Sequence, residues 1–163
     1  MKEIIIQKED AVFWLDKSGY WQNDGGKFRK KKIIDLFHRS IGKDENGYFV
    51  SRTLEGILEK VYFRYEDTAL FVFAVHFNDD ILLSLNTGKQ LRLVPEDLYV
   101  KDDNLYLTHA DEPIKFSERA LMRIFSLMEE DDQSGQLVIH INGNRFYIPE
   151  KKDINNYSNL LTP

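Results

Sequence analysis

The sequence predicts an α+β fold with two lobes, a repeated hairpin–helix–strand unit and an antiparallel β-meander. Several short runs alternate apolar and polar residues, which is typical of strands. Two stripes of apolar residues at helical spacing predict two helices. The dipeptide Asn142-Gly143 is a strong signal for a tight hairpin. With 163 residues, 42% of them hydrophobic, the chain can bury a core large enough to fold.

The first predicted elements are a hairpin and a helix. Bulky and polar residues alternate over residues 12–21, on both sides of the turn sequence Asp16-Lys17-Ser18-Gly19. After a glycine-containing loop, helical spacing appears in a stripe made of Phe28, Ile33, Ile34, Phe37 and Ile41. Gly42 follows this stripe, so the helix is expected to end there.

An antiparallel meander is predicted from residue 48 to residue 93. Alternation indicates strands over residues 61–65, 70–77, 81–85 and 89–93. Polar turn residues separate neighbouring strands, and the short turns suit hairpins. In the run 70–77 both alternating sets are mainly apolar, so we expect that strand to be central and covered on both faces.

The C-terminal half predicts a second helix and a last hairpin. Ser117 is the expected N-cap, and the apolar stripe contains Ala120, Leu121, Ile124, Phe125 and Met128. The acidic run 129–132 is expected to end the helix. Strands over 137–141 and 144–148 then flank the Asn142-Gly143 turn. Beyond Pro149 the sequence is a polar tail with little periodicity.

The two halves resemble each other. Residues 13–20 parallel residues 99–106, and the helix stripes correspond in order, so that Phe37 and Phe125 are expected in equivalent core positions. This similarity predicts an N-terminal lobe over residues 1–97, a C-terminal lobe over 98–149 and a tail over 150–163. Coincidence is the alternative, because amphipathic helices commonly follow hairpins.

Composition excludes several classes of chemistry. Cysteine is absent, which excludes disulfides, thiolate nucleophiles and Cys-type zinc sites. The four histidines lack the spacing that places two ligands on one helix face. Nucleophile and phosphate-loop motifs are missing as well. We therefore predict no catalytic residue, no metal site and no cofactor, although a small enzyme remains an alternative.

Charge and hydropathy limit the expected partners. The net charge of −5 gives no general attraction to nucleic acid, which is an unlikely partner on this ground. No run approaches the roughly 20 apolar residues that cross a bilayer, and the start of the chain does not have the pattern of a signal peptide. The sequence is thus typical of a bacterial cytoplasmic protein that binds no membrane; it gives no oligomeric state.

A cluster of cations opens the first predicted helix, where positive charge opposes the helix dipole. It consists of Lys27, Arg29, Lys30, Lys31 and Lys32. A solvated surface is the simplest explanation, since exposed lysines cost little in water. The alternatives are contact with an anionic small molecule or an acidic protein partner, and contact with nucleic acid.

Aromatic side chains are numerous among the predicted strands. They include Trp14, Trp21, Tyr48, Tyr62 and Tyr65. Packing of sheet against helix explains them, and the alternative is a pocket in which aromatic rings supply contact area and polar groups.

Several short segments, taken in order, resemble one bacterial family. These segments are residues 15–21, Leu36-Phe37, residues 44–48, Thr53-Leu54-Glu55, Glu66-Asp67 and residues 85–88. Their order resembles the domain of unknown function family 1285, best over residues 12–93. The resemblance implies a two-lobed α+β fold with a repeated unit, no demonstrated enzyme activity, and a role in signalling or ligand binding.

The resemblance also suggests ligand-binding residues, namely Thr53, Glu55 and Asn86. Leu54 stands where the family pattern has proline, so a backbone fixed by proline is missing at this turn. The function predicted from the sequence is a non-catalytic cytoplasmic ligand-binding or regulatory module, with an unknown small molecule or an acidic protein as partner. The alternatives are a small enzyme that uses Glu55 with a nearby histidine, and a protein-interaction subunit.

Overall fold

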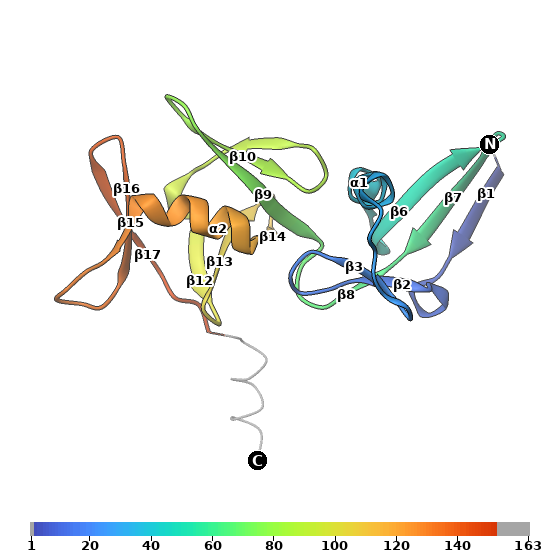
Figure 1. The fold of residues 1–163 in the computed structure, drawn as a ribbon, viewed down its shortest axis with the longest axis horizontal. Helices are drawn as coiled ribbons and strands as arrows, with labels where there is room; N and C mark the ends of the chain where they lie inside the picture. The colour runs from blue at the N-terminus through green and yellow to red at the C-terminus, as the bar shows by residue number, and fades with distance from the viewer. Residues whose placement is uncertain (1, 153–163) are drawn as a thin grey trace, which may run out of the picture. The chain divides into compact units, whose positions relative to one another are not determined.

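The computed structural model describes residues 2–152 as a mixed α+β protein, mainly β-sheet with two short helices (Figure 1). The chain divides into two compact units. Among the described residues, unit 1 contains residues 2–71 and 85–90, and unit 2 contains residues 72–84 and 91–152. No helix in the described part of the chain is both long and apolar enough to cross a membrane.

The first sheet of unit 1 has the strand order β1-β7-β6-β5. The outer strand β1 pairs in parallel with β7, whereas β7, β6 and β5 are antiparallel neighbours. The turn between β6 and β7 contains Glu55 at φ 51° and Gly56 at φ 76°. These strands are β1 (Lys2–Ile6), β5 (Ile41–Asp44), β6 (Gly47–Leu54) and β7 (Ile57–Tyr62).

The second sheet of unit 1 has the order β4-β3-β2-β8; β2, β3 and β4 precede helix α1 in the chain, whereas β8 follows it. The predicted first hairpin is present: buried Asp16 accepts hydrogen bonds from the backbone N–H groups of Ser18 and Tyr20, both at 2.9 Å. The elements are β2 (Phe13–Leu15), β3 (Trp21–Asn23), β4 (Gly26–Lys27), β8 (Arg64–Tyr65), α1 (Lys31–Arg39) and the 3-10 helix η1 (Lys8–Asp10).

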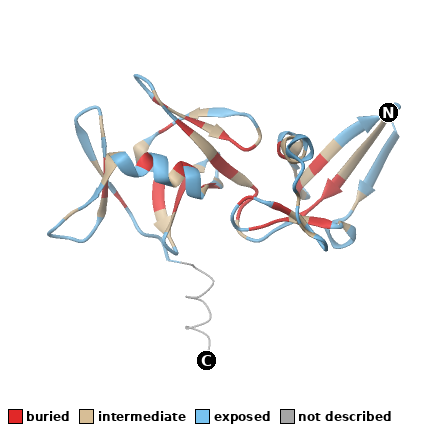
Figure 2. Ribbon diagram, in the orientation of Figure 1, coloured by how far each residue is buried: buried red, intermediate tan, exposed pale blue. Residues whose placement is uncertain are grey.

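An aromatic cluster joins α1 to this second sheet. The Phe37 ring makes edge contacts with Phe13, Trp21 and Phe28, at centroid distances of 5.0, 5.4 and 5.1 Å. Trp21 in turn contacts Phe63 at 4.9 Å. Edge-to-face packing of this kind stabilises beyond simple area burial. In Figure 2, strands β2 and β3 are among the segments of unit 1 that contain buried residues.

A buried hydrogen-bond network fixes the C-terminal end of α1 through His38. The indole Nε1 of Trp21 donates to His38 Nδ1 at 3.2 Å, and Asn86 Nδ2 lies 3.3 Å from the same atom. Asn86 also donates to the carbonyl of Ala69 at 3.1 Å and accepts from the N–H of Phe71 at 3.0 Å. Because Trp Nε1 can only donate, His38 Nδ1 is unprotonated and the imidazole is neutral. Burial lowers the pKa of His38 to about 4, although Asp35 opposes the shift.

Unit 2 contains most of a six-stranded sheet with the order β11-β10-β9-β14-β13-β12. The prediction that residues 70–77 form a central strand is confirmed, because β9 lies between β10 and β14 and buries Phe71, Val72 and Val75. The strands are β9 (Leu70–Phe77), β10 (Ile81–Leu85), β11 (Gln90–Arg92), β12 (Leu98–Lys101), β13 (Asn104–His109) and β14 (Glu112–Phe116).

Helix α2 and a three-stranded sheet complete unit 2. The Ser117 side chain caps α2 by accepting from the Ala120 N–H at 3.2 Å, as predicted. The last hairpin has its predicted bounds, and Asn142 and Gly143 both have positive φ, as a type I′ turn requires. The elements are η2 (Pro95–Asp97), α2 (Glu118–Ile124), η3 (Phe125–Leu127), β15 (Met128–Glu130), β16 (Leu137–Ile141) and β17 (Asn144–Ile148).

The prediction of one continuous meander from residue 48 to residue 93 is wrong. Strands β6 and β7 pair with each other and share one sheet with β1 and β5, whereas β9, β10 and β11 belong to the six-stranded sheet. The chain leaves β7 after Tyr62, and the next two-residue strand, β8, pairs in parallel with β2. The predicted meander is thus divided between sheets, because β7 and β8 pair with β1 and β2, strands that lie far from them in the sequence.

Both helices are shorter than their apolar stripes. Phe28 precedes α1 and its N–H bonds to the Trp21 carbonyl at 2.9 Å, while Ile41 begins β5. Helix α2 ends at Ile124, and the acidic run begins in strand β15 rather than at a helix end. Phe125 follows the last residue of α2 and is 46% exposed, so its predicted core position is wrong. The internal repeat itself stays a prediction.

The unit boundaries differ from the predicted lobes. The sequence predicts the meander wholly within the N-terminal lobe, whereas the division between units falls within β9, β10 and β11. Of the predicted tail, residues 153–163 lie outside the described residues.

The neutral state of His38 makes the free energy of unfolding depend on pH. The unfolded imidazole takes up a proton near pH 6.5, whereas the folded one does so only near pH 4. The stabilisation is therefore complete above pH 6.5 and is lost as the pH falls toward 4, by about 3 kcal/mol in total. Urea denaturation at a series of pH values measures this loss.

His38→Gln is the matched variant, because glutamine keeps a hydrogen-bond acceptor and does not titrate. We expect the pH dependence between 7 and 4 to be smaller in this variant by about the same 3 kcal/mol. Equal slopes in the two proteins would show that His38 does not bind its proton as described.

Candidate functional site

A cavity of about 410 Å³ lies between α1 and strands β6 and β7 of unit 1. We call it the α1 groove. Its walls are mainly apolar side chains, with an amide, two hydroxyls and one Arg–Glu pair among them. The lining residues are Val12, Phe13, Asn23, Phe28, Ile33, Leu36, Phe37, Ser40, Val50, Ser51, Arg52, Glu59 and Val61.

Three apolar side chains of the groove are unusually exposed. Ile33 is 41%, Leu36 57% and Val12 77% exposed. Ile33, Leu36 and Phe37 lie at positions i, i+3 and i+4 of α1 and so share one face of the helix. Single exposed apolar residues are common on protein surfaces, but several that line one concavity are typical of a binding site.

The polar groups of the groove are partly paired. Arg52 and Glu59 are directly opposite in the β6–β7 ladder, and Arg52 Nε lies 3.5 Å from Glu59 Oε1. The pair brings no net charge to the groove. Ser40, the C-cap of α1, donates its hydroxyl to the Leu36 carbonyl at 2.6 Å, so this hydroxyl is engaged within the helix end.

The five predicted cations lie just before α1 or in its first turn, and all five are exposed. Two of them have partners within the chain: Lys31 Nζ bonds Asp35 at 2.6 Å, and Lys27 Nζ lies 4.1 Å from the centroid of the Tyr20 ring. Arg29, Lys30 and Lys32 have no ion pair among the described residues. Phe28 and Ile33 line the α1 groove. Arg29 directly follows Phe28 in the chain, and Lys32 directly precedes Ile33.

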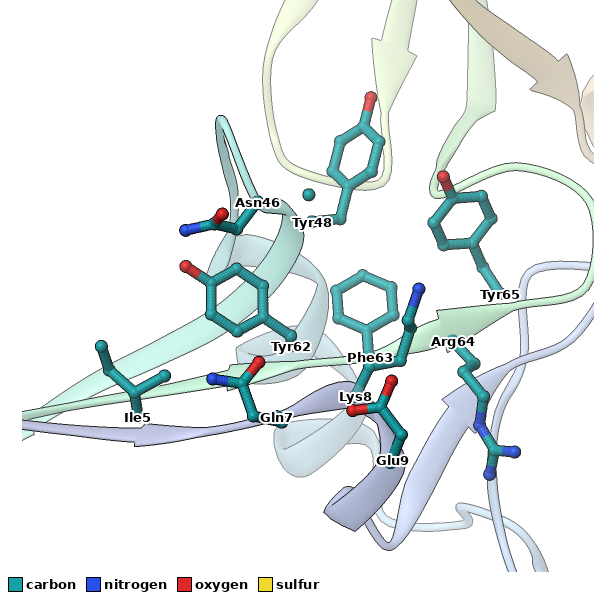
Figure 3. Close-up of a pocket in the computed structure, with 11 residues that line it drawn as sticks. Ile5, Gln7, Lys8, Glu9, Asn46, Tyr48, Tyr62, Phe63, Arg64 and Tyr65 are labelled. Atoms are coloured by element: carbon teal, nitrogen blue, oxygen red, sulfur yellow. The ribbon is translucent and has the colours of Figure 1, made fainter.

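A second cavity of unit 1, of about 540 Å³, is lined by three of the predicted pocket tyrosines (Figure 3). We call it the tyrosine cleft. It lies beside β7 and β8 and the turn that precedes β6, next to the end of β1 and η1. The lining residues are Ile5, Gln7, Lys8, Glu9, Asn46, Gly47, Tyr48, Tyr62, Phe63, Arg64 and Tyr65.

The tyrosines of this cleft have different environments. Tyr48 packs edge-to-face against Tyr65 at 5.7 Å, and burial, with Tyr65 as a lesser cause, raises the pKa of Tyr48 to about 12. The Tyr62 hydroxyl donates to Asp44 Oδ2 at 2.6 Å, which raises the pKa of Tyr62 and lowers the pKa of Asp44. Both phenols therefore stay protonated at neutral pH.

The three residues that the family resemblance suggested are not gathered in one site. Thr53 and Glu55 are exposed at the outer end of the β6–β7 hairpin, where Glu55 occupies the turn. Asn86 is buried in the network with His38. None of the three lines the α1 groove or the tyrosine cleft. Their ligand-binding roles stay predictions, and Asn86 has in addition a structural role.

Three of the four histidines have side-chain partners other than Glu55. His38 contacts Trp21 and Asn86, His76 Nε2 lies 3.0 Å from the Ser84 hydroxyl, and His140 Nε2 lies 2.8 Å from Glu129 Oε1. Glu55 makes no hydrogen bond or ion pair within residues 2–152. In the same residues, no group of three or more His, Asp or Glu side chains could hold a metal ion.

Sequence reasoning missed much of both cavities. The sequence pattern gives Val12 and Leu36 no role beyond strand and helix positions, and it gives Lys8 and Arg64 no functional role. The signal for Leu36 was present, because it lies at i+3 from Ile33 on the apolar face. No local signal could bring residues 5–9 to the tyrosines, because this contact depends on the parallel pairing of β1 with β7.

Comparison with known proteins establishes the fold. No family model and no curated protein matches this sequence. A crystal structure of a DUF1285 family protein from Silicibacter pomeroyi DSS-3 matches with a TM-score of 0.58 at 14% identity, covering 90% of this chain and 83% of that one. A DUF1285 family protein from Shewanella baltica OS155 matches with a TM-score of 0.51 at 17% identity, covering 73% and 94%.

The chain therefore has a DUF1285-like fold. The resemblance found in its short sequence segments is confirmed at this level. The names of the two structural neighbours state no ligand, reaction or partner, so the functional argument rests on the cavities of this chain.

Replacing Asn86 with alanine tests its structural role. The change removes the partners of the buried Phe71 N–H and Ala69 carbonyl, so we expect the free energy of unfolding to fall by about 2–4 kcal/mol. Asn104→Ala is the control, because its side chain makes one hydrogen bond at the surface and its loss should cost under about 1 kcal/mol. Equal stability losses in urea denaturation would contradict a structural role.

Proposed function

We propose that the protein is a non-catalytic binding module for a small amphiphilic anion, whose apolar part lies in the α1 groove. The observation that carries the proposal is the apolar groove itself, open to solvent through Val12, Ile33 and Leu36, with unpaired cations next to it in the chain. Its volume of about 410 Å³ lies within the range of small-molecule sites, roughly 300–1,000 Å³.

The apolar walls provide the main binding energy in this proposal. Removing apolar surface from water contributes about 25 cal/mol per Å². A ligand in the groove would cover Leu36 and Val12, which the fold leaves 57% and 77% exposed. Phe13 and Phe37 belong to the packed aromatic cluster, so the floor of the groove is already ordered before a ligand arrives.

The cations select the charge of the ligand. Arg29, Lys30 and Lys32 bear three positive charges on a protein whose net charge is −5, so they form a local positive region against an acidic background. An anionic head group next to them gains charge-assisted hydrogen bonds. The Arg52–Glu59 pair at the other wall is neutral overall and favours an uncharged part of the ligand.

The polar lining supports binding rather than catalysis. It consists of Asn23, Ser40, Ser51 and the mutually paired Arg52 and Glu59. The Ser40 hydroxyl donates to the helix backbone, and the carboxylate of Glu59 is engaged by Arg52. A nucleophile beside a general base, the arrangement that covalent catalysis uses, is absent from these lining residues.

Isothermal titration with decanoate and decanol tests the proposal. The two probes share an apolar chain and differ in the head group. We expect decanoate to bind about tenfold more tightly than decanol at low ionic strength, and the difference to shrink as salt is added. Leu36→Glu should weaken both probes at least about tenfold, because it places a charge on the apolar wall.

Three further variants complete the test. Leu54→Glu alters an equally exposed leucine outside the groove and should bind as the unmodified protein does. Lys30→Glu combined with Lys32→Glu should weaken decanoate alone, whereas Lys2→Glu with Lys89→Glu makes the same charge change elsewhere in unit 1. Equal affinities for both probes, or no effect of Leu36→Glu, would refute the proposal.

A further inference from the structure

We propose that the tyrosine cleft is a second, separate binding site, and that it binds a nucleoside monophosphate. The inference goes beyond the α1 groove, since the two cavities share no lining residue. It rests on three features that lie together in one cavity of about 540 Å³: aromatic rings, cationic side chains and polar groups that both donate and accept hydrogen bonds.

Aromatic rings line the middle of the cleft. Phe63 is 1% exposed and fixed in the core, while Tyr65 is 42% exposed and packs against both Phe63 and Tyr48, at 6.2 and 5.7 Å. Figure 3 shows the Tyr48 and Tyr65 hydroxyls pointing to the same side, above the Phe63 ring. An exposed ring supported from behind by packed rings offers a stacking surface for a planar base.

Cations are available next to these rings. Lys8 and Arg64 line the cleft, are exposed, and have no ion pair among the described residues. Glu9 is the one carboxylate in the lining, so the cationic groups exceed the anionic ones. Guanidinium and ammonium groups are the usual partners of phosphate oxygens.

The remaining polar groups suit a ribose and the edge of a base. Gln7 and Asn46 carry amides, which both donate and accept hydrogen bonds, and the Glu9 carboxylate accepts from hydroxyl groups. A purely apolar ligand would leave these groups without partners, at a cost in affinity.

The two parts of the cleft together determine the class of ligand. Inorganic phosphate would use Lys8 and Arg64 but leave the aromatic surface bare, and an uncharged nucleoside would use the rings but leave the cations bare. A nucleoside monophosphate engages both parts with one molecule. Its affinity should therefore exceed that of either fragment.

Isothermal titration of the full chain tests this inference with AMP, GMP, CMP and UMP, and with the four nucleosides and inorganic phosphate. We expect at least one nucleotide to bind about tenfold more tightly than both its nucleoside and phosphate at low ionic strength. Absence of nucleotide binding up to about 5 mM would overturn the proposal. So would a nucleotide that binds no better than phosphate or than its nucleoside.

Variants assign the two parts of the ligand. Arg64→Gln should weaken the nucleotide about tenfold and leave the nucleoside unchanged, because Arg64 is exposed and its loss removes only charge. Tyr65→Ser should weaken nucleotide and nucleoside alike. Arg39→Gln and Tyr20→Ala are the controls, since both residues are exposed, belong to unit 1 and lie outside the cleft.

The Arg64→Gln result remains decisive if Tyr65→Ser folds poorly, because Tyr65 contacts two other rings whereas Arg64 makes no ion pair with any residue from 2 to 152. Unchanged nucleotide affinity in Arg64→Gln would overturn the proposal. Leu36→Glu, the α1 groove variant, should bind the nucleotide normally, which keeps the outcome independent of the proposed function of that groove.

Discussion

The buried contact between His38 and Asn86 organises unit 1. Three segments distant in the sequence meet there: the end of α1, strand β3 through Trp21, and the short stretch around Asn86 that follows β10. Each polar atom named in this network has a partner, which is the condition under which buried polar groups specify one arrangement rather than weaken the core. This network fixes the position of α1. Because α1 forms one wall of the α1 groove, the network also fixes that wall.

Short-range signals in the sequence predicted much of the local structure. Ser117 caps a helix, Asp16 stabilises a turn, and Asn142-Gly143 forms the hairpin that this dipeptide favours. Each of these interactions involves residues within four positions of each other, so the sequence alone contains the cause. The α+β class followed from the same periodicities.

Long-range pairing could not be predicted in the same way. The parallel pairs β1–β7 and β2–β8 join residues about fifty positions apart, and they, rather than alternation, decide which sheet a strand enters. The exposure of Phe125 has a similar origin, because its spacing fits the helix stripe but α2 ends one residue earlier. Of the candidate sites, the tyrosines of the cleft and the cations beside α1 were visible in the sequence, whereas the partners that complete each cavity were not.

The division between the units within β9 and β10 has a consequence for the gene. Residues 85–90 belong to unit 1 but are separated from the rest of that unit by thirteen residues of unit 2. A fragment that ends at Phe71 would lack Asn86, and His38, Ala69 and Phe71 would lose the amide that joins them. Neither half of the coding sequence therefore encodes a complete unit, and recombination or proteolysis at its midpoint would not release an independently folded module.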